Sequence, residues 1–388
     1  MIRRNCLATA CLAATLAFAA SARAEDITIG AHMPLTGSLA RSGQAFNEGM
    51  QVALRVFNES QSKHRIKVTV IDDESQPAKA VTAVEKLSSD GAAAIIGGYG
   101  SNIVGPASDT SNRLGKVYIT GGAVSDELVQ RGNKNFFRIN NNAGYQRGVE
   151  GLIEEVKPNG VSIIASTKEA PMLLAKGLEE SLAKKGYKVT LHPFDPAITD
   201  FKPIINKVKL QDKSEIIFMS AYENDYVGII RAAKVLKPPV KAIVGAWSLA
   251  TPKMYSDFPD LMQNVIGTTF LPFPVEVKDE EGRKFAAVYK EMFGKEIEYA
   301  STLAFVETMV LSEALARSAD AGTLKSGGLL AEMKTTNRPS PLGRITFNEV
   351  GDNPNFALSM GQHRDGKIPL VSPAEFATGK LAYPAVPW

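Results

Sequence analysis

The chain has 388 residues, of which 44% are hydrophobic and 22% are charged, a composition typical of a globular protein with a large core. Its formal net charge of +3 comes from the first 24 residues, which hold three of the 44 basic residues and no acidic one, so the remainder carries 41 basic and 41 acidic residues. This balance gives no electrostatic basis for binding nucleic acid or an anionic membrane. After Ala24 no apolar run approaches the ~18 residues of a membrane-spanning helix, so we expect no membrane insertion.

Residues 1–24 have the pattern of a cleavable signal peptide. A tip with two arginines precedes the apolar run Cys6–Ala20, and Ala22-Arg23-Ala24 fits the small-x-small cleavage site. We therefore expect an exported mature chain that begins at Glu25. Both cysteines of the chain lie in the signal segment, so the mature chain has none for a disulfide, a thiolate metal site or a nucleophile. Its length suits two domains of roughly 150 to 200 residues each.

Strands and helices alternate along the first part of the mature chain. Ile27, Ile29 and Ala31 alternate with polar residues and predict a strand, which ends at Pro34–Gly37. In chain order we then expect a helix over 44–57, a strand over 66–71, a helix over 77–88, a strand over 93–96, a helix ending near 114 and a strand over 117–120. This alternation indicates right-handed crossovers and a parallel, doubly wound α/β sheet.

The same alternation starts again after Asn140-Asn141-Asn142 and predicts a second α/β sheet. We expect helices over 146–156, 172–185, 204–210 and 226–236, and strands over 161–165, 188–192, 216–219 and 242–244. Two further helices are expected over 280–292 and 301–319, then a strand over 344–347. A terminal hairpin over 356–371 turns at Arg364-Asp365-Gly366.

Several short motifs, in this order and spacing, resemble the branched-chain amino acid (Leu/Ile/Val) binding-protein family of type I periplasmic receptors. They are Ile27–Gly30, Pro34–Gly37, Asp72–Ser75, Ile96–Gly98, Pro106–Asp109 and Pro341–Gly343, with a tail of Pro373–Phe376, Tyr383-Pro384 and Trp388. The similarity runs over essentially the whole mature sequence. It implies the non-enzymatic binding component of an ABC importer, which carries a small molecule in the periplasm to permease subunits.

The resemblance also implies two discontinuous lobes joined by a three-crossover hinge. We place the crossings near Asn142, Phe273 and Asp352. The N-terminal lobe then comprises 25–142 plus 273–352, and the C-terminal lobe 143–272 plus 353–388. Such a hinge allows the lobes to close on a ligand while each sheet stays rigid.

One candidate binding loop runs from Gly98 to Ser101, between a predicted strand and a helix. Ligands of doubly wound sheets lie outside the carboxyl ends of the strands, and the N–H groups at a helix start suit a carboxylate. The resemblance places Ser101 at the position of the serine that binds the substrate carboxylate, with Tyr99 beside it. The alternative is that Ser101 is only a helix cap.

A second candidate loop follows the strand that ends at Thr120. The resemblance places Gly122 where a backbone carbonyl contacts the ligand, followed by Ala123, and places Val124 where the family carries a threonine. Ser125 is a possible replacement for the missing hydroxyl. Glycines here also fit a plain turn, because they permit unusual backbone angles.

In the second lobe the resemblance places Tyr222 at a ligand-stacking tyrosine and Trp247 where amino acid binders carry an acid for the ammonium. Burying an ammonium without a countercharge costs several kcal/mol, whereas tryptophan offers apolar surface and a ring face for a cation. Glu169 is either a replacement countercharge or a solvent-facing residue. Arg41 and Ser42 lie in the opening loop, near the entrance position.

The carboxylate half of the family's site is thus kept and the ammonium half is altered. We expect the ligand to be an amino acid or a related aromatic or aliphatic carboxylate, bound without a cofactor or metal.

Three other functions compete with this interpretation. A dinucleotide enzyme would explain Gly98-x-Gly100, but Ile103 replaces the third glycine. A hydrolase would need a Gly-x-Ser-x-Gly motif or a catalytic triad, and the four histidines, His32, His64, His192 and His363, are scattered without such spacing. A ligand sensor of the same fold, for amides or aromatic acids, is the remaining alternative, because a fold alone does not separate uptake from signalling.

Overall fold

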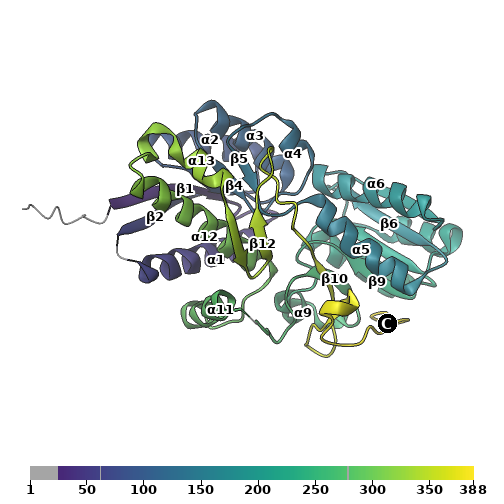
Figure 1. The fold of residues 1–388 in the computed structure, drawn as a ribbon. Helices are drawn as coiled ribbons and strands as arrows, with labels where there is room; N and C mark the ends of the chain where they lie inside the picture. The colour runs from purple at the N-terminus through teal and green to yellow at the C-terminus, as the bar shows by residue number, and fades with distance from the viewer. Residues whose placement is uncertain (1–24, 62, 278) are drawn as a thin grey trace, which may run out of the picture.

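A computed structural model describes residues 25–388 except positions 62 and 278; the expected signal peptide lies outside these residues. The chain folds into two α/β lobes, each built on its own sheet (Figure 1). The first sheet has the strand order β2-β1-β3-β4-β5, and the second has the order β14-β13-β10-β9-β8-β6-β7. No helix in the described part of the chain is both long and apolar enough to span a bilayer.

The first sheet is parallel throughout, and helices cover both of its faces (Figure 1). Its strands are β1 (Glu25–Met33), β2 (His64–Asp72), β3 (Ile95–Gly97), β4 (Tyr118–Thr120) and β5 (Phe136–Arg138). Its helices are α1 (Ala40–Ser60), α2 (Pro77–Ser89), α3 (Ser101–Arg113), α4 (Glu127–Gln130), α11 (Glu280–Phe293), α12 (Tyr299–Asp320) and α13 (Gly328–Lys334), with a 3₁₀ turn at Leu324–Ser326. Helix α2 packs on α3, and α1 packs on α11 and α12, so late segments of the chain complete the first lobe.

The second sheet is parallel from β7 to β10 and antiparallel at β13 and β14. Its strands are β6 (Val161–Ser166), β7 (Val189–Phe194), β8 (Ile216–Ser220), β9 (Ala242–Gly245), β10 (Ile266–Thr269), β13 (Ser359–Gln362) and β14 (Leu370–Ser372). The helices are α5 (Asn142–Val156), α6 (Glu169–Lys184), α7 (Lys202–Lys207) with a π-helical turn at Val208–Asp212, α8 (Glu223–Leu236), α9 (Pro252–Asp257), α10 (Pro259–Met262) and a 3₁₀ turn at Ala374–Phe376. The terminal hairpin thus extends a parallel sheet with antiparallel strands.

The predicted α/β fold with two sheets is confirmed, and the differences concern short elements. The sequence did not predict strands β5, β10 and β11 (Asn337–Ser340). Strand β12 (Gly343–Thr346), which pairs with β11 in a small hairpin, corresponds to the strand expected over 344–347. Strands β5 and β10 have three and four residues, all buried, so no alternation marks them. Helix α6 begins at Glu169, earlier than expected, because Pro171 is tolerated in a first turn.

The chain passes between the two sheets three times: from β5 to β6, from β10 to α11 and from β12 to β13. Two of these connections lie side by side, because Arg138 at the end of β5 forms a parallel bridge with Asp352. The lobes are therefore joined by three connections, two of them adjacent, rather than by one linker.

His363, next to β13, makes the second lobe sensitive to acid. Its side chain is fully buried, its Nε2 lies 2.8 Å from the Leu249 carbonyl oxygen, and burial lowers its pKa from 6.5 to about 4. Between these two values only the unfolded chain takes up the proton, so the free energy of unfolding falls as the pH drops through this window. The shift corresponds to about 3 kcal/mol.

We therefore predict that His363→Gln flattens the dependence of stability on pH between 6.5 and 4. The measurement is urea unfolding of both proteins at pH 4, 5, 6.5 and 8. At pH 8 the histidine is neutral in both states, so the difference between the proteins there gives the cost of the substitution itself. Parallel pH profiles for the two proteins would contradict the assignment.

Candidate functional site

A narrow cavity lies between the two lobes at the carboxyl ends of both sheets. Its free volume is about 10 Å³, roughly the space that one water molecule needs and far below that of pockets for drug-sized ligands. The first lobe contributes Tyr99, Gly100, Ser101, Gly121, Gly122, Val124, Asn140 and Tyr299, and the second contributes Ala170, Tyr222 and Trp247. Apart from Tyr299, at the start of α12, these residues follow β3, β4, β5, β6, β8 and β9, which is where doubly wound sheets bind ligands.

The loop after β3 takes a sharp turn that depends on glycine and on a buried polar network. Gly98 has a φ of +75°, and a Cβ there would come within 2.7 Å of Val104. Beneath the loop, His32 bonds Asp73 through Nδ1 at 2.9 Å and Tyr118 through Nε2 at 2.6 Å. The Tyr118 hydroxyl donates in turn to the Gly97 carbonyl oxygen at 3.1 Å. The network holds the loop rigidly under the cavity.

Ser101 begins α3 and is 1% exposed. Its Oγ accepts hydrogen bonds from the backbone N–H groups of Val124 at 3.2 Å and Ser125 at 3.1 Å. Because these bonds occupy the acceptor positions of the hydroxyl, its own proton remains available for another acceptor, and Ser101 lines the cavity. The Gly100 N–H also donates to the Gly122 carbonyl oxygen at 2.9 Å, so the two candidate loops are tied together.

A buried guanidinium holds the second candidate loop in place. Arg138 is 0% exposed and donates to the carbonyl oxygens of Val124 and Ser125 at 2.9 and 2.7 Å. It also pairs with Asp126 at 3.0 Å and with both oxygens of Asp352 at 2.8 and 3.0 Å. The five hydrogen bonds link the loop that contacts Ser101 to one of the connections between the lobes.

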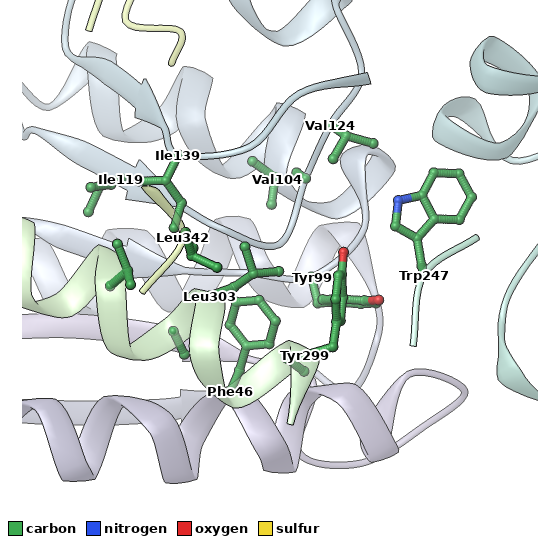
Figure 2. Packing of buried hydrophobic residues seen from close by; sticks show 14 of the residues in the cluster. Phe46, Tyr99, Val104, Ile119, Val124, Ile139, Trp247, Tyr299, Leu303 and Leu342 are labelled. Atoms are coloured by element: carbon green, nitrogen blue, oxygen red, sulfur yellow. The ribbon is translucent and has the colours of Figure 1, made fainter. Parts of the chain in front are cut away.

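Aromatic rings from both lobes meet across the cavity. Trp247 stacks on Tyr222 with ring centres 5.9 Å apart and lies 5.6 Å from the ring of Tyr145. Tyr99 lies 6.3 Å from Tyr222, and Figure 2 shows Trp247 across the gap from Tyr99 and Tyr299. Since these rings fill most of the space, a ligand can enter only when the lobes or the rings move apart.

Direct polar contacts also join the lobes beside the cavity. The Ser42 hydroxyl donates to the Glu223 carboxylate and lies 3.4 Å from Ser248 Oγ, which is also 3.4 Å from the Tyr99 hydroxyl. Arg41 forms an ion pair with Asp257. Burial raises the pKa of Glu223 above its usual value. Arg41 and Ser42 therefore bridge the lobes and do not line the cavity.

The structure brings six of the ten predicted site residues together around the cavity: Tyr99, Ser101, Gly122, Val124, Tyr222 and Trp247. Ala123 and Ser125 are buried in the second loop outside the lining. Glu169 is half-buried, with one carboxylate oxygen that is buried and lacks a partner among the described residues; its neighbour Ala170 reaches the cavity.

Sequence reasoning missed Asn140 and Tyr299. Asn140 follows the unrecognised strand β5, and Tyr299 comes from a segment far along the chain. The Asn140-Asn141-Asn142 run was visible in the sequence, but only as the end of the first lobe.

No group of His, Cys, Asp and Glu residues in the described chain is arranged to hold a metal ion. The cavity instead presents a serine hydroxyl, backbone groups, an amide and aromatic rings. These groups can form hydrogen bonds to a ligand and stack on it.

The fold and the cavity define a two-lobed binding protein, and a family model described as "Periplasmic binding protein" matches residues 26–367. The chain belongs to this family. The Leu/Ile/Val-binding protein homolog 3 of Brucella melitensis is 25% identical over 93% of this chain and 98% of its own length. BraC3 of Rhizobium johnstonii, a Leu/Ile/Val-binding protein, is 26% identical over 93% of this chain and 97% of its own.

Solved structures share the fold at lower identity. The branched-chain amino acid transporter substrate-binding protein LivJ of Streptococcus pneumoniae, in complex with isoleucine, superposes with a TM-score of 0.79 at 20% identity and covers 92% of this chain and 100% of its own. A solute-binding protein of an ABC transporter from Rhodopseudomonas palustris, in complex with 3,4-dihydroxybenzoic acid, has a TM-score of 0.78 at 16% identity, with 88% and 95% covered. The same fold thus serves ligands of two classes.

We predict that Arg138→Met lowers the free energy of unfolding by at least about 3 kcal/mol, because it removes a buried charge that makes five hydrogen bonds and leaves the carbonyl oxygens of the buried residues Val124 and Ser125 without this donor. Arg113→Ala is the matched control, since Arg113 pairs with Glu85 on the surface and such pairs contribute at most about 1 kcal/mol. Urea unfolding monitored by fluorescence measures both. Equal losses in the two variants would contradict the role given to Arg138.

Proposed function

We propose that this protein is the periplasmic substrate-binding component of an ABC importer, which binds a small carboxylate between its lobes and delivers it to permease subunits. The observation that carries the proposal is the Ser101 hydroxyl. Its oxygen accepts hydrogen bonds from two backbone N–H groups of the second loop, so its proton is available for an acceptor on the ligand. Ser101 is also the first residue of helix α3. A carboxylate suits both the donor and the positive helix terminus.

We propose that the lobes move as two bodies, 25–142 plus 273–352 and 143–272 plus 353–388, with hinges near Asn142, Phe273 and Asp352. The three connections, two of which lie side by side at Arg138 and Asp352, support this division, since a hinge of a few residues lets rigid sheets close around a ligand. The aromatic rings that meet across the cavity support the same movement, because ligand entry requires them to separate.

Uptake is favoured over sensing and over catalysis. The relatives are named as Leu/Ile/Val-binding proteins. One structural neighbour is named as the substrate-binding protein of a branched-chain amino acid transporter, and the other as a solute-binding protein of an ABC transporter. Residues 1–24 would be removed as the export signal. The lining of the cavity supports an amino acid or an aromatic or aliphatic carboxylate as the ligand, held by contacts and released unchanged.

Ser101→Ala should weaken carboxylate binding roughly 10- to 100-fold, the worth of a hydrogen bond to a charged group. The control is Ser108→Ala, a buried serine on the same helix whose hydroxyl donates to the Gly105 carbonyl outside the cavity. Calorimetric titration of residues 25–388 with leucine, 4-methylpentanoate, benzoate and 4-hydroxybenzoate measures the affinities. If both variants bind the acids as the parent does, Ser101 is not the carboxylate donor; if no acid binds the parent, the ligand class is wrong.

A disulfide between the lobes should trap the closed state. Ser42 Oγ and Ser248 Oγ lie 3.4 Å apart on different lobes, and residues 25–388 contain no other cysteine that could compete. In the double variant Ser42→Cys/Ser248→Cys, we expect oxidation to slow ligand association at least about tenfold, because the lobes must part for entry. The same protein after reduction is the control. Equal association rates before and after reduction would contradict lobe opening.

A further inference from the structure

We propose that Asn140 is a specificity-determining residue of the cavity, whose Oδ1 atom accepts a hydrogen bond from a hydroxyl group on the carboxylate ligand. The inference deepens the proposed function and rests on it. It assigns the ligand to the hydroxy-substituted acids, with the carboxylate at Ser101 and the hydroxyl at Asn140.

The hydrogen bonds of the Asn140 amide fix which atom faces the cavity. Its Nδ2 donates to the Gly121 carbonyl oxygen at 2.9 Å and lies 3.5 Å from the Tyr145 hydroxyl. Turning the amide over would set Oδ1 against the Gly121 carbonyl oxygen, where two acceptors repel each other. Oδ1 is therefore the atom left for another partner.

That atom has no partner. Asn140 is 1% exposed, its Oδ1 is buried, and no hydrogen bond to it exists within the described residues. Among the cavity-lining side chains described, Asn140 alone has a buried polar atom in this condition. Buried acceptors in native proteins are nearly always satisfied, so an orphaned acceptor in a binding cavity indicates a donor on the ligand.

The charge of the surroundings favours a hydroxyl over an ammonium as that donor. Asn140 and the Gly122 carbonyl are neutral acceptors, and Trp247 offers a ring rather than a carboxylate. Two carboxylates lie near the cavity, and neither is among its lining residues. Glu223 accepts a hydrogen bond from the Ser42 hydroxyl. Glu169, next to the lining residue Ala170, is half-buried and has one buried oxygen without a partner among the described residues. A neutral donor can be buried against a neutral acceptor, whereas an ammonium group also needs a countercharge.

The walls of the cavity fit the rest of such a ligand. Tyr99, Tyr222, Trp247 and Tyr299 supply flat aromatic surface around the polar groups. Apolar carbon atoms of the ligand, aliphatic or aromatic, pack against these rings without a further polar partner. The cavity thus combines a donor for a carboxylate, an acceptor for a hydroxyl and an apolar wall.

The test compares ligands that differ only in the donor group. Calorimetry measures the affinities of the unmutated protein and of Asn140→Leu for two series of ligands. One series is 2-hydroxy-4-methylpentanoate, 4-methylpentanoate and leucine, and the other is 4-hydroxybenzoate and benzoate. In the unmutated protein we expect the hydroxy acid of at least one series to bind five- to tenfold more tightly than the corresponding acid without the hydroxyl. In Asn140→Leu we expect this ratio to fall to about one.

Two further variants separate recognition from stability. Asn140→Asp should shift the preference from the hydroxy acid towards leucine, because it supplies the missing countercharge. Asn58→Leu is the control. The Asn58 side chain donates to the Ile66 carbonyl oxygen and accepts from the Ile66 N–H, away from the cavity. This substitution should therefore alter stability but leave the ratio of ligand affinities unchanged.

Each outcome has one meaning. A hydroxyl preference that survives in Asn140→Leu, or a parent protein that prefers leucine through Asn140, overturns the inference while the proposed function stands. Failure of every acid to bind the parent overturns the proposed function and the inference with it. A preference that is present in the parent, lost in Asn140→Leu and kept in Asn58→Leu establishes Asn140 as the hydroxyl acceptor.

Discussion

The geometry of the site depends on one buried guanidinium. Arg138 holds the carbonyl oxygens of Val124 and Ser125, and the N–H groups of the same two residues hold Ser101 Oγ. The orientation of the serine proton is therefore set by a residue that does not line the cavity. Because a buried charge without partners is costly, the loop is fixed firmly in this position, and Asp352 extends the constraint to a connection between the lobes.

The two lobes contribute different kinds of surface to the cavity. The first lobe presents polar groups on loops that are locked by the networks of His32 and Arg138. The second presents the stacked rings of Tyr222 and Trp247, which follow separate strands of that lobe. A ligand can thus be oriented by hydrogen bonds on one side and then covered by apolar surface on the other, which joins recognition to closure.

The sequence predicted most of the fold, because long strands and helices alternate and their hydrophobic patterns are clear. It also placed six lining residues, since Tyr99, Ser101, Gly122, Val124, Tyr222 and Trp247 follow strands or lie near their ends. The parts that it could not predict depend on short or distant segments. Strand β5 has only three residues, so nothing marked Asn140 as a strand-end residue.

Contacts between distant segments were equally invisible to pattern analysis. Tyr299 reaches the cavity because α12 packs in the first lobe, and no local sequence pattern predicts against which distant segment a helix packs. Arg41 and Ser42, which the sequence placed in an opening loop, lie in the first turn of α1, and their partners Asp257 and Glu223 lie on the other lobe. Such pairs follow from the closed arrangement of the lobes, which no local sequence pattern encodes.

The most direct test of the central claim, that Ser101 receives a ligand carboxylate between the lobes, is a crystal structure of residues 25–388 with the tightest-binding acid. The account predicts a closed protein with a carboxylate oxygen at roughly 2.5 to 3.0 Å from Ser101 Oγ and the rings of Tyr222 and Trp247 against the ligand. A carboxylate bound by the second lobe, or a ligand outside the cavity between the lobes, would contradict it.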